Sequence, residues 1–253
     1  MSAPSPSAIA QSFSRGFSSY HGAATPQSAI ACELVERLVA ARGRAPADHV
    51  FEFGCGTGFL TDCLAENVPS ARLTLNDLTD AAALTAARHG ATFLRGDVRT
   101  IDWPGVPDLI VSASTIQWLA DPATLLRRAV RALAPGGWLA VSGFGPAQFT
   151  ELQTLGYALP VPGLVCAKTL ASWLGDLGLD PLISTEALWP MEFSSPHDVL
   201  RHLRRTGVNA GRSRPWTKRD LAAFSSDYQN QFSTPRGVTL SYHPVWLIAR
   251  KPA

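Results

Sequence analysis

The chain has 253 residues, of which 46% are hydrophobic and 17% charged, with a formal net charge of +2. This length and composition exclude a disordered or fibrous chain and predict one globular domain over residues 1–253. No apolar run approaches the roughly 18 to 20 residues that cross a bilayer, and the first residues lack the pattern of a signal peptide. We therefore expect a cytoplasmic protein that does not enter a membrane.

The positive charge is local. Seven of the 22 basic residues lie between Arg201 and Arg219, where there is no acidic residue, so the rest of the chain has an acidic excess. Local basic surface binds an acidic partner or is a solvated face. Apart from Trp216, no aromatic residue is interleaved with these charges, which disfavours nucleic-acid binding.

The four cysteines form no CxxC pair and no cluster with histidine at metal-ligand spacing; they are Cys32, Cys55, Cys63 and Cys166. We interpret them as reduced, buried, small apolar residues, and we expect no metal site. The sequence offers no base to activate Cys55 as a nucleophile.

In chain order, residues 1–8 are rich in Ser, Pro and Ala and predict disorder, and residues 9–45 predict N-terminal helices. Phe13, Phe17 and Tyr20 share one helical face. We expect the two phenylalanines to pack on the core. Tyr20 carries a hydroxyl and stands just before Gly22, where it can overhang a ligand. A longer helix begins at Pro26, with an apolar stripe at Ile30, Leu34, Leu38 and Val39.

Between residues 46 and 144, short apolar runs alternate with helical segments, which predicts a parallel sheet with crossover helices. The predicted strands are His49 to Phe53, Arg72 to Leu75, Ala91 to Leu94, Pro107 to Ser112 and Gly137 to Ser142. The predicted helices are Phe59 to Asn67, Ala81 to Arg88 and Pro122 to Leu133.

A glycine-rich turn follows the first of these strands, with Gly54, Gly56 and Gly58 at alternate positions and Glu52 two residues before them. Glycine accepts positive φ and lets a ligand approach the backbone, and open α/β sheets hold cofactors at the carboxyl ends of their strands. The spacing is not the GxGxxG of dinucleotide-binding folds. A carboxylate beside the loop repels phosphate and attracts a ligand that carries an amine and a sulfonium.

Three later strands also end in polar or small residues. Asp77 lies where a nucleotide-binding unit places an acid on the ribose hydroxyls, and it is also suited to the start of the next helix. Asp97 is placed to accept from an adenine amine while Val98 offers a backbone N–H; a plain turn aspartate is the alternative. Ser112 ends the fourth strand, where it would form the floor of a cofactor site.

The stretch from Glu52 to Gly58 resembles the first motif of class I S-adenosylmethionine-dependent methyltransferases, and the turn from Leu133 to Leu139 resembles their helix-to-strand turn. The resemblance implies a Rossmann-like α/β fold: a mostly parallel seven-stranded sheet with helices on both faces. It implies S-adenosylmethionine as cofactor. The residues expected to bind it are Glu52, Gly54, Cys55, Gly56, Gly58, Asp77, Leu78, Asp97, Val98 and Ser112.

Beyond Ser142 the composition changes. A helix is predicted around Leu170 to Leu174, a strand over Ile183 to Phe193, a helical basic segment over 195–234 and a terminal strand over Val245 to Arg250. We interpret 145–168 and 195–234 as insertions that cap the substrate side of the sheet, the second as a helical lid.

Further stretches are similar to the malonyl-acyl-carrier-protein O-methyltransferases that begin biotin synthesis. They are Phe17 to Gln27, Gln117-Trp118 with Asp121-Pro122, Phe149 to Leu152, Val199 to Val208 and Leu240 to Tyr242. The resemblance implies methyl transfer to the free carboxylate of a malonyl thioester, carried by acyl carrier protein or coenzyme A, by a monomer. That carboxylate needs no general base, since carboxylic acids titrate at about pH 4.

The substrate carboxylate needs a hydrogen-bonding or cationic clamp. Tyr20 and Gln117 are the candidates for direct roles in catalysis, Trp118 would form a wall of the pocket, and Arg201, Arg204 and Arg205 are candidates for substrate binding. The arginine-rich segment would also attract the acidic carrier protein. For Gln117 and Trp118, packing at the head of a helix is the alternative; for the arginines, it is a solvated face.

Two other functions remain open from the sequence. The core motifs serve many acceptors, so a methyltransferase of another small carboxylic acid or metabolite is one alternative. A non-catalytic regulator that binds S-adenosylmethionine is the other.

Overall fold

The computed structural model describes residues 24–157, 161–207 and 216–253 of the chain. Tyr20, the predicted helix before it and the predicted disorder of residues 1–8 lie outside the described residues, as do Arg212 and Arg214. The elements of the first half are α2 (Thr25–Arg42), β1 (Ala47–Phe53), α3 (Phe59–Asn67), β2 (Ser70–Asp77), the 3₁₀ turn η1 (Asp80–Ala82), α4 (Ala83–Arg88), β3 (Thr92–Arg95), β4 (Leu109–Ser112), the 3₁₀ turn η2 (Ile116–Trp118), α5 (Pro122–Ala132) and β5 (Trp138–Phe144).

The second half continues the sheet and adds a smaller one. Its elements are α6 (Thr150–Thr154), α7 (Ala167–Asp176), β6 (Asp180–Glu186), β7 (Trp189–Phe193), α8 (Pro196–Arg205), α9 (Lys218–Phe232), β8 (Ser233–Thr234), β9 (Gly237–Tyr242) and β10 (Pro244–Arg250). The large sheet has seven strands in the order β3-β2-β1-β4-β5-β10-β6. Among the described strands of this sheet, β10 alone is antiparallel to its neighbours, so the prediction of a mostly parallel seven-stranded sheet is confirmed.

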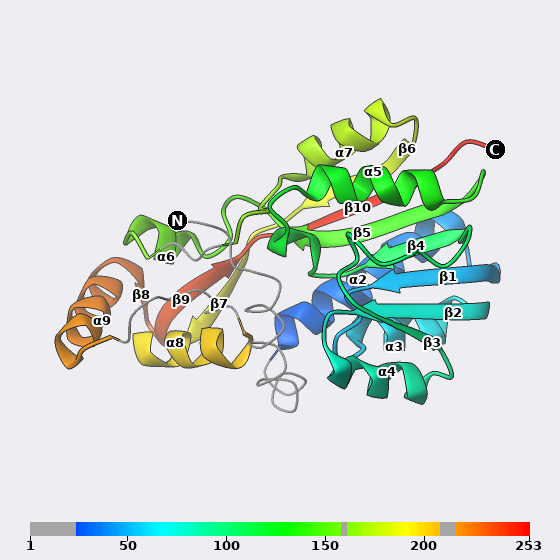
Figure 1. Ribbon diagram of the computed structural model, residues 1–253. Helices are drawn as coiled ribbons and strands as arrows, with labels where there is room; N and C mark the ends of the chain where they lie inside the picture. The colour runs from blue at the N-terminus through cyan, green and yellow to red at the C-terminus, as the bar shows by residue number, and fades with distance from the viewer. Residues whose placement is uncertain (1–23, 158–160, 208–215) are drawn as a thin grey trace.

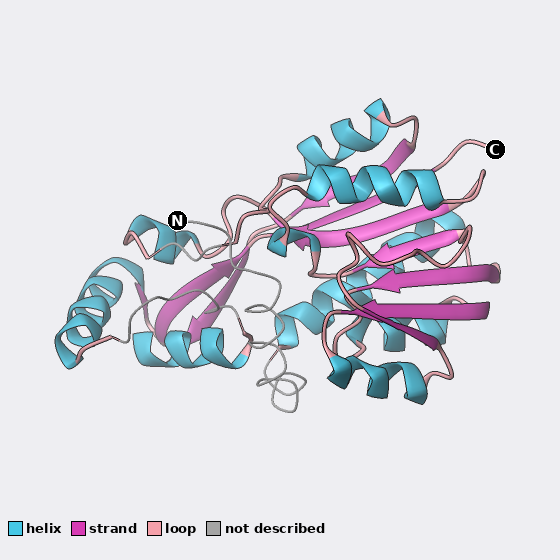
Figure 2. Cartoon of the chain, viewed as in Figure 1, coloured by secondary structure: helices cyan, strands magenta, loops and turns pink. Residues whose placement is uncertain are grey.

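Both faces of the large sheet are covered by helices (Figure 2). Successive residues of a strand point to opposite faces, so Val50 joins the core cluster with α2 and α3, whereas Phe51 joins the cluster with α5 and α7. In β4, Ile110 likewise faces away from Leu109 and Val111. A strand that is buried on both sides has no polar face, which explains the continuous apolar runs of the sequence.

A small lobe lies beyond the carboxyl ends of the parallel strands (Figure 1). We define it as α6, α8, α9 and the three-stranded sheet β7-β9-β8. Two chain segments connect the large sheet with this lobe: β6 is followed by β7, and β9 is followed by β10. β6 pairs antiparallel with β10 in the large sheet, and β7 pairs antiparallel with β9 in the small sheet. The prediction of one strand over Ile183 to Phe193 was wrong at its centre, because the chain leaves the large sheet at Ala187-Leu188 and enters the small one.

Hydrogen bonds fasten the small lobe to the large sheet around His243, the residue between β9 and β10. The His243 N–H donates to Gln148 Oε1 at 2.7 Å, and its Nδ1 accepts from the Ala147 N–H at 2.9 Å. The Glu151 carboxylate of α6 accepts from the N–H of Ser241 at 2.9 Å and from its hydroxyl at 2.6 Å. The start of the 145–168 segment is therefore held against the strand that joins the two sheets.

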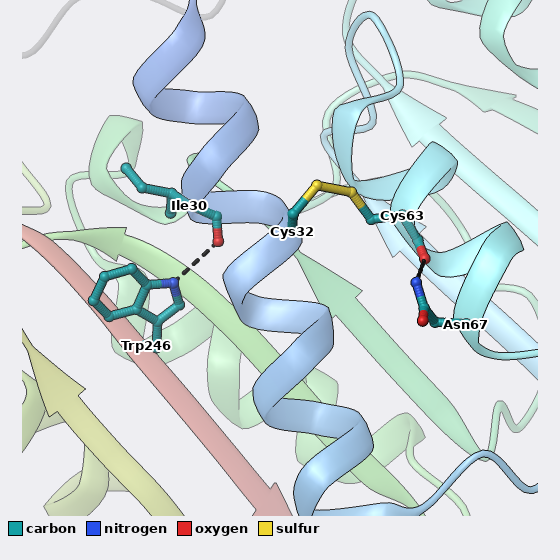
Figure 3. Close-up of a disulfide and its surroundings, with 5 residues drawn as sticks. All are labelled: Ile30, Cys32, Cys63, Asn67 and Trp246. Atoms are coloured by element: carbon teal, nitrogen blue, oxygen red, sulfur yellow. Dashed lines mark hydrogen bonds between the residues drawn. A yellow bond between two sulfur atoms is a disulfide. The ribbon is translucent and has the colours of Figure 1, made fainter.

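The interpretation of all four cysteines as reduced was wrong. Cys32 of α2 and Cys63 of α3 form a disulfide, with their Cα atoms 5.5 Å apart (Figure 3). The two cysteines are 31 positions apart on packed helices, so no short sequence motif indicates that they pair. Cys55 is free and buried as expected, whereas Cys166 is free but partly exposed. In the described part of the chain, no helix is long and apolar enough to cross a membrane.

Candidate cofactor site

The glycine loop follows β1 directly and leads into α3. All three glycines have positive φ, 71° at Gly54, 48° at Gly56 and 99° at Gly58. A Cβ on Gly54 would overlap the Thr115 side chain, whereas a Cβ on Gly56 would meet open space. Gly54 is therefore required by packing as well as by its backbone angle. Gly56 leaves room above the loop for a ligand.

The N–H groups of Gly54 and Cys55 both donate to the Asn76 carbonyl, at 2.8 and 3.0 Å. The Asn76 side chain donates in turn to the carbonyls of Leu94 and Gly96. This buried asparagine at the end of β2 joins the ends of three strands, a role that was not predicted from the sequence. Burial raises the pKa of the Cys55 thiol, so the thiol stays protonated and is no nucleophile.

Glu52 is buried, with 1% of its surface exposed, and its carboxyl accepts from the Thr61 hydroxyl at 2.8 Å. Burial raises its pKa to about 8; the Thr61 hydrogen bond opposes the rise and the charges of Asp62 and Asp77 add to it. A buried carboxyl with one donor is costly to ionise unless a cation lies close to it. This electrostatic environment suits a cationic ligand.

Asp77 also contacts the glycine loop. One carboxylate oxygen accepts from the Gly56 N–H at 2.9 Å, and the other accepts from the N–H and the hydroxyl of Thr79 at 2.8 and 2.9 Å. Burial raises the pKa of Asp77, and these hydrogen bonds oppose the rise. The oxygen that accepts only from Gly56 retains a lone pair, so contact with a ribose hydroxyl stays compatible with this geometry. Leu78 lies between Asp77 and Thr79, directly after β2.

The third strand end has a different arrangement from the expected one. Asp97 binds the side chain of Arg99 through both carboxylate oxygens, with Nε at 2.9 and 3.1 Å, and this hydrogen bonding lowers the pKa of Asp97. An adenine amine would share the carboxylate with this guanidinium, so adenine recognition stays a prediction. Val98 is buried, and its carbonyl accepts from Trp103 Nε1 at 2.9 Å.

The turn after β4 supplies the other side of the site. Ser112 is fully buried and donates to the Phe53 carbonyl at 2.8 Å, so its hydroxyl ties β4 to β1. Ser114 has a φ of 52°, unusual for a residue other than glycine. Gln117 is 3% exposed and donates from Nε2 to the Ser114 carbonyl at 2.6 Å. Trp118 packs against the core cluster that extends into the small lobe.

The predicted arginines lie on α8 in the small lobe. All three are exposed, and Arg201 pairs with Asp198 at 2.9 Å within the same helix. The structure therefore brings together the loop, the two carboxyl groups and the β4 turn, while it leaves Arg204 and Arg205 on an outer helix face. Two contributing residues were not predicted from the sequence: Asn76, which connects separate strand ends, and Thr115, which packs against Gly54.

Several buried polar atoms around the loop have no hydrogen-bond partner among the described residues. They are Thr57 Oγ1, Ser114 Oγ, Gln117 Oε1 and Ser142 Oγ. Buried polar groups are nearly always paired in folded proteins, so unpaired ones at the carboxyl ends of strands are consistent with a polar ligand. Together with the space above Gly56 and the acid at Glu52, they fit a cofactor that has an amino-acid end.

The sheet order, the antiparallel β10 and the glycine loop after β1 are those of the Rossmann-like fold of class I S-adenosylmethionine-dependent methyltransferases. The family pattern described as "Methyltransferase domain" matches residues 51–141. Solved structures with this fold include the N-methyltransferase NodS of Bradyrhizobium japonicum with S-adenosyl-L-homocysteine, with a TM-score of 0.59, 17% identity and 97% and 99% of the two chains covered. Another is magnesium protoporphyrin IX methyltransferase of Synechocystis, with a TM-score of 0.53 and 16% sequence identity. That match covers 88% of this chain and 82% of the other.

The sequence identity to members of one family is higher than to these solved structures. The chain is 34% identical over 258 residues to the malonyl-[acyl-carrier protein] O-methyltransferase of Bacteroides thetaiotaomicron, covering 96% of this chain and 97% of the relative. It is 36% identical over 252 residues to that of Chlorobium luteolum, with 96% and 94% covered. The chain belongs to the malonyl-[acyl-carrier protein] O-methyltransferase family. It is an enzyme, and its cofactor is S-adenosylmethionine.

Proposed function

We propose that this protein methylates the free carboxylate of a malonyl thioester, bound to acyl carrier protein or coenzyme A, to give the methyl ester that primes biotin synthesis. The observation that carries the proposal is the 34–36% identity, along nearly the whole chain, to relatives named for this reaction. The absence of a recognisable base in the site residues is consistent with it, since the acceptor is already ionised at neutral pH.

The site residues have distinct proposed roles. The backbone of Gly54, Cys55, Gly56 and Gly58, with Glu52, would hold the amino-acid end of the cofactor, while Asp77, Leu78, Asp97, Val98 and Ser112 would surround its nucleoside. When bound, S-adenosylmethionine would supply an electrophilic methyl group. The chain would contribute orientation and exclusion of water, the effects that accelerate a reaction between two bound groups of opposite charge.

Gln117 is the described residue best placed to orient the acceptor. It uses one N–H of its amide on the Ser114 carbonyl, and the amide has a second N–H and an unpaired Oε1. Gly163, in the 145–168 segment, donates to the Gln117 carbonyl at 2.9 Å, so that segment closes on the same turn. We propose that Gln117 and Tyr20 bind the substrate carboxylate and that Trp118 forms a wall beside them.

The exposed face of α8 would dock the acidic carrier protein through Arg201, Arg204 and Arg205. Val199 and Leu203 bury the other side of the helix, so these charges face solvent. The paired change Arg204→Glu and Arg205→Glu should raise KM for the carrier-bound substrate and leave KM for malonyl-CoA unchanged, because complementary charge acts on encounter with the carrier. The same reversal at the exposed Arg127 and Arg131 of α5 is the control. Equal effects on the two substrates would reject the docking surface.

A cytoplasmic location and a monomeric state complete the proposal. A bacterial enzyme that acts on an acyl carrier protein would meet its substrate in the cytoplasm. Thiol reductants there act against disulfides, so the Cys32–Cys63 bond would be open to reduction.

The direct test of the acceptor class is product formation with coenzyme A thioesters. S-adenosylhomocysteine should accumulate with malonyl-CoA and not with acetyl-CoA, which has no free carboxylate. Accumulation with succinyl-CoA at the same rate would indicate a methyltransferase of another carboxylic acid. No accumulation with any acceptor would contradict the proposed reaction.

A further inference from the structure

Helix α4 contacts the glycine loop through the side chains of Thr85 and Arg88. The Thr85 hydroxyl donates to the Gly56 carbonyl at 2.8 Å, and Arg88 Nη2 donates to the Thr57 carbonyl at 3.2 Å. Both side chains also lie where a Cβ on Gly58 would be. Two consecutive carbonyls of the loop are thus bound by the same helix.

These bonds determine where the loop directs its N–H groups. The described residues contain no cis peptide bond, and in a trans peptide the C=O and the following N–H point in opposite directions. With the Gly56 carbonyl turned toward Thr85, the Thr57 N–H points away from α4. On the neighbouring peptide, the Gly56 N–H is held by Asp77 at 2.9 Å. The loop is therefore restrained on both sides of Gly56.

Thr57 is the residue that this arrangement leaves available. Its N–H has no acceptor among the described residues, and its hydroxyl is buried without a partner, at 7% exposure of the residue. The N–H groups at the start of a helix are suited to an anionic group, and Thr57 stands just before α3. The carboxylate of an amino-acid ligand would satisfy both groups.

Arg88 is itself held in place. Its Nη2 also donates to Asp62 Oδ1 in the first turn of α3 at 2.8 Å, and the same oxygen contacts His89 Nε2 at 2.7 Å. The guanidinium consequently links α4, the loop and α3. Thr85 is 2% exposed, so its hydroxyl does not exchange its bond with the loop for water.

We propose that Thr85 is a positioning residue for the cofactor: by holding the Gly56 carbonyl, it directs the Thr57 N–H toward the carboxylate of the bound S-adenosylmethionine, with Arg88 as a second support. This inference rests on the proposed assignment of the glycine loop to the amino-acid end of the cofactor. Thr85 itself does not touch the ligand.

The test compares Thr85→Val, which keeps shape and loses the donor, with Thr85→Ser, which keeps the donor. Calorimetric titration with S-adenosylhomocysteine should show Kd raised about tenfold in Thr85→Val, the size expected for one lost hydrogen bond that leaves a buried carbonyl unpaired. Thr85→Ser should restore the wild-type Kd. KM for S-adenosylmethionine should rise with Kd, while KM for the acceptor stays constant.

Two control variants isolate the effect. Thr154→Val removes an exposed hydroxyl-to-carbonyl bond in α6, away from the loop, and should leave Kd unchanged. Arg95→Gln removes an exposed cation that pairs with Asp80 close to α4, and should also leave Kd unchanged, whereas Arg88→Gln should raise it.

A wild-type Kd in Thr85→Val would overturn the proposal. So would a raised Kd that Thr85→Ser fails to restore, because Thr85 would then only support the fold. Gly56→Ala separates this failure from failure of the loop assignment, since its Cβ enters the open space above the loop. If Gly56→Ala weakens binding and Thr85→Val does not, the positioning role alone is wrong; if neither does, the cofactor binds elsewhere.

Discussion

Replacing Glu52 with glutamine should remove the pH dependence of cofactor binding. The Glu52 carboxyl is buried beside the loop, and burial raises its pKa to about 8, against an ordinary value of 4.5. In the free protein at pH 7 the group is therefore mainly protonated. The cationic amine of the cofactor favours the ionised form, so binding should release a proton from Glu52.

The magnitude follows from linkage between the proton and the ligand. If Glu52 titrates below pH 6 in the complex, the apparent affinity for the cofactor rises about 50-fold between pH 6 and pH 8. The reason is that each pH unit below the pKa of Glu52 in the free protein lowers this affinity about tenfold. The Glu52→Gln protein has no proton to release there. Its affinity should be lower than that of the wild type at pH 8 and nearly constant across the range.

Stability should show the opposite trend in the free protein. The folded pKa lies above the unfolded one, so the folded chain retains a proton that the unfolded chain releases. The free energy of unfolding should therefore fall as pH rises from 4.5 to about 8, by at most about 5 kcal/mol. Glu52→Gln should flatten this part of the profile.

The assay is titration calorimetry with S-adenosylhomocysteine, which keeps the amine but has no methyl group to transfer, in phosphate and in Tris between pH 6 and pH 8. Different binding enthalpies in the two buffers report proton release. Asp48→Asn, a change at an exposed carboxylate, is the control and should behave as the wild type. Equal affinities at pH 6 and pH 8, or the same slope in Glu52→Gln, would refute the reasoning.

Two further predictions concern the frame of the site. Opening the Cys32–Cys63 disulfide, by reduction or by replacing both cysteines with serine, should lower the free energy of unfolding by about 3–4 kcal/mol, the size expected for a closed loop of this length. The measurement is urea unfolding, and an unchanged midpoint would contradict this prediction. Gly54→Ala should abolish binding of S-adenosylhomocysteine, because the added Cβ overlaps Thr115 at a backbone angle that disfavours any side chain. Binding is measured by calorimetry, and retained binding would contradict this packing argument.

The sequence predicted those parts of the molecule that depend on neighbouring residues. The helix from Phe59 to Asn67 has the predicted bounds, because a glycine in the left-handed region begins it and the apolar period continues from there. The three loop glycines all need the positive φ that their spacing suggested. The pairing of Asp97 with Arg99, two residues along, was also readable locally but was not considered.

The parts that were missed depend on contacts between distant segments. The break in the predicted strand at Ala187-Leu188 exists because β9 and β10 pair with two different sheets, a fact of topology rather than of local preference. The disulfide joins helices whose cysteines are 31 residues apart. Thr85 looked like an ordinary residue of a short helix, and its role depends on a loop 29 positions earlier.

The most direct test of the central proposal is the intact mass of loaded carrier proteins after incubation with this enzyme and S-adenosylmethionine. Malonyl-, succinyl- and acetyl-acyl carrier protein are compared side by side. We predict a gain of one methyl group on the malonyl form alone. No gain on the malonyl form, in a protein that still binds S-adenosylhomocysteine, would contradict the proposed substrate and leave the cofactor site standing.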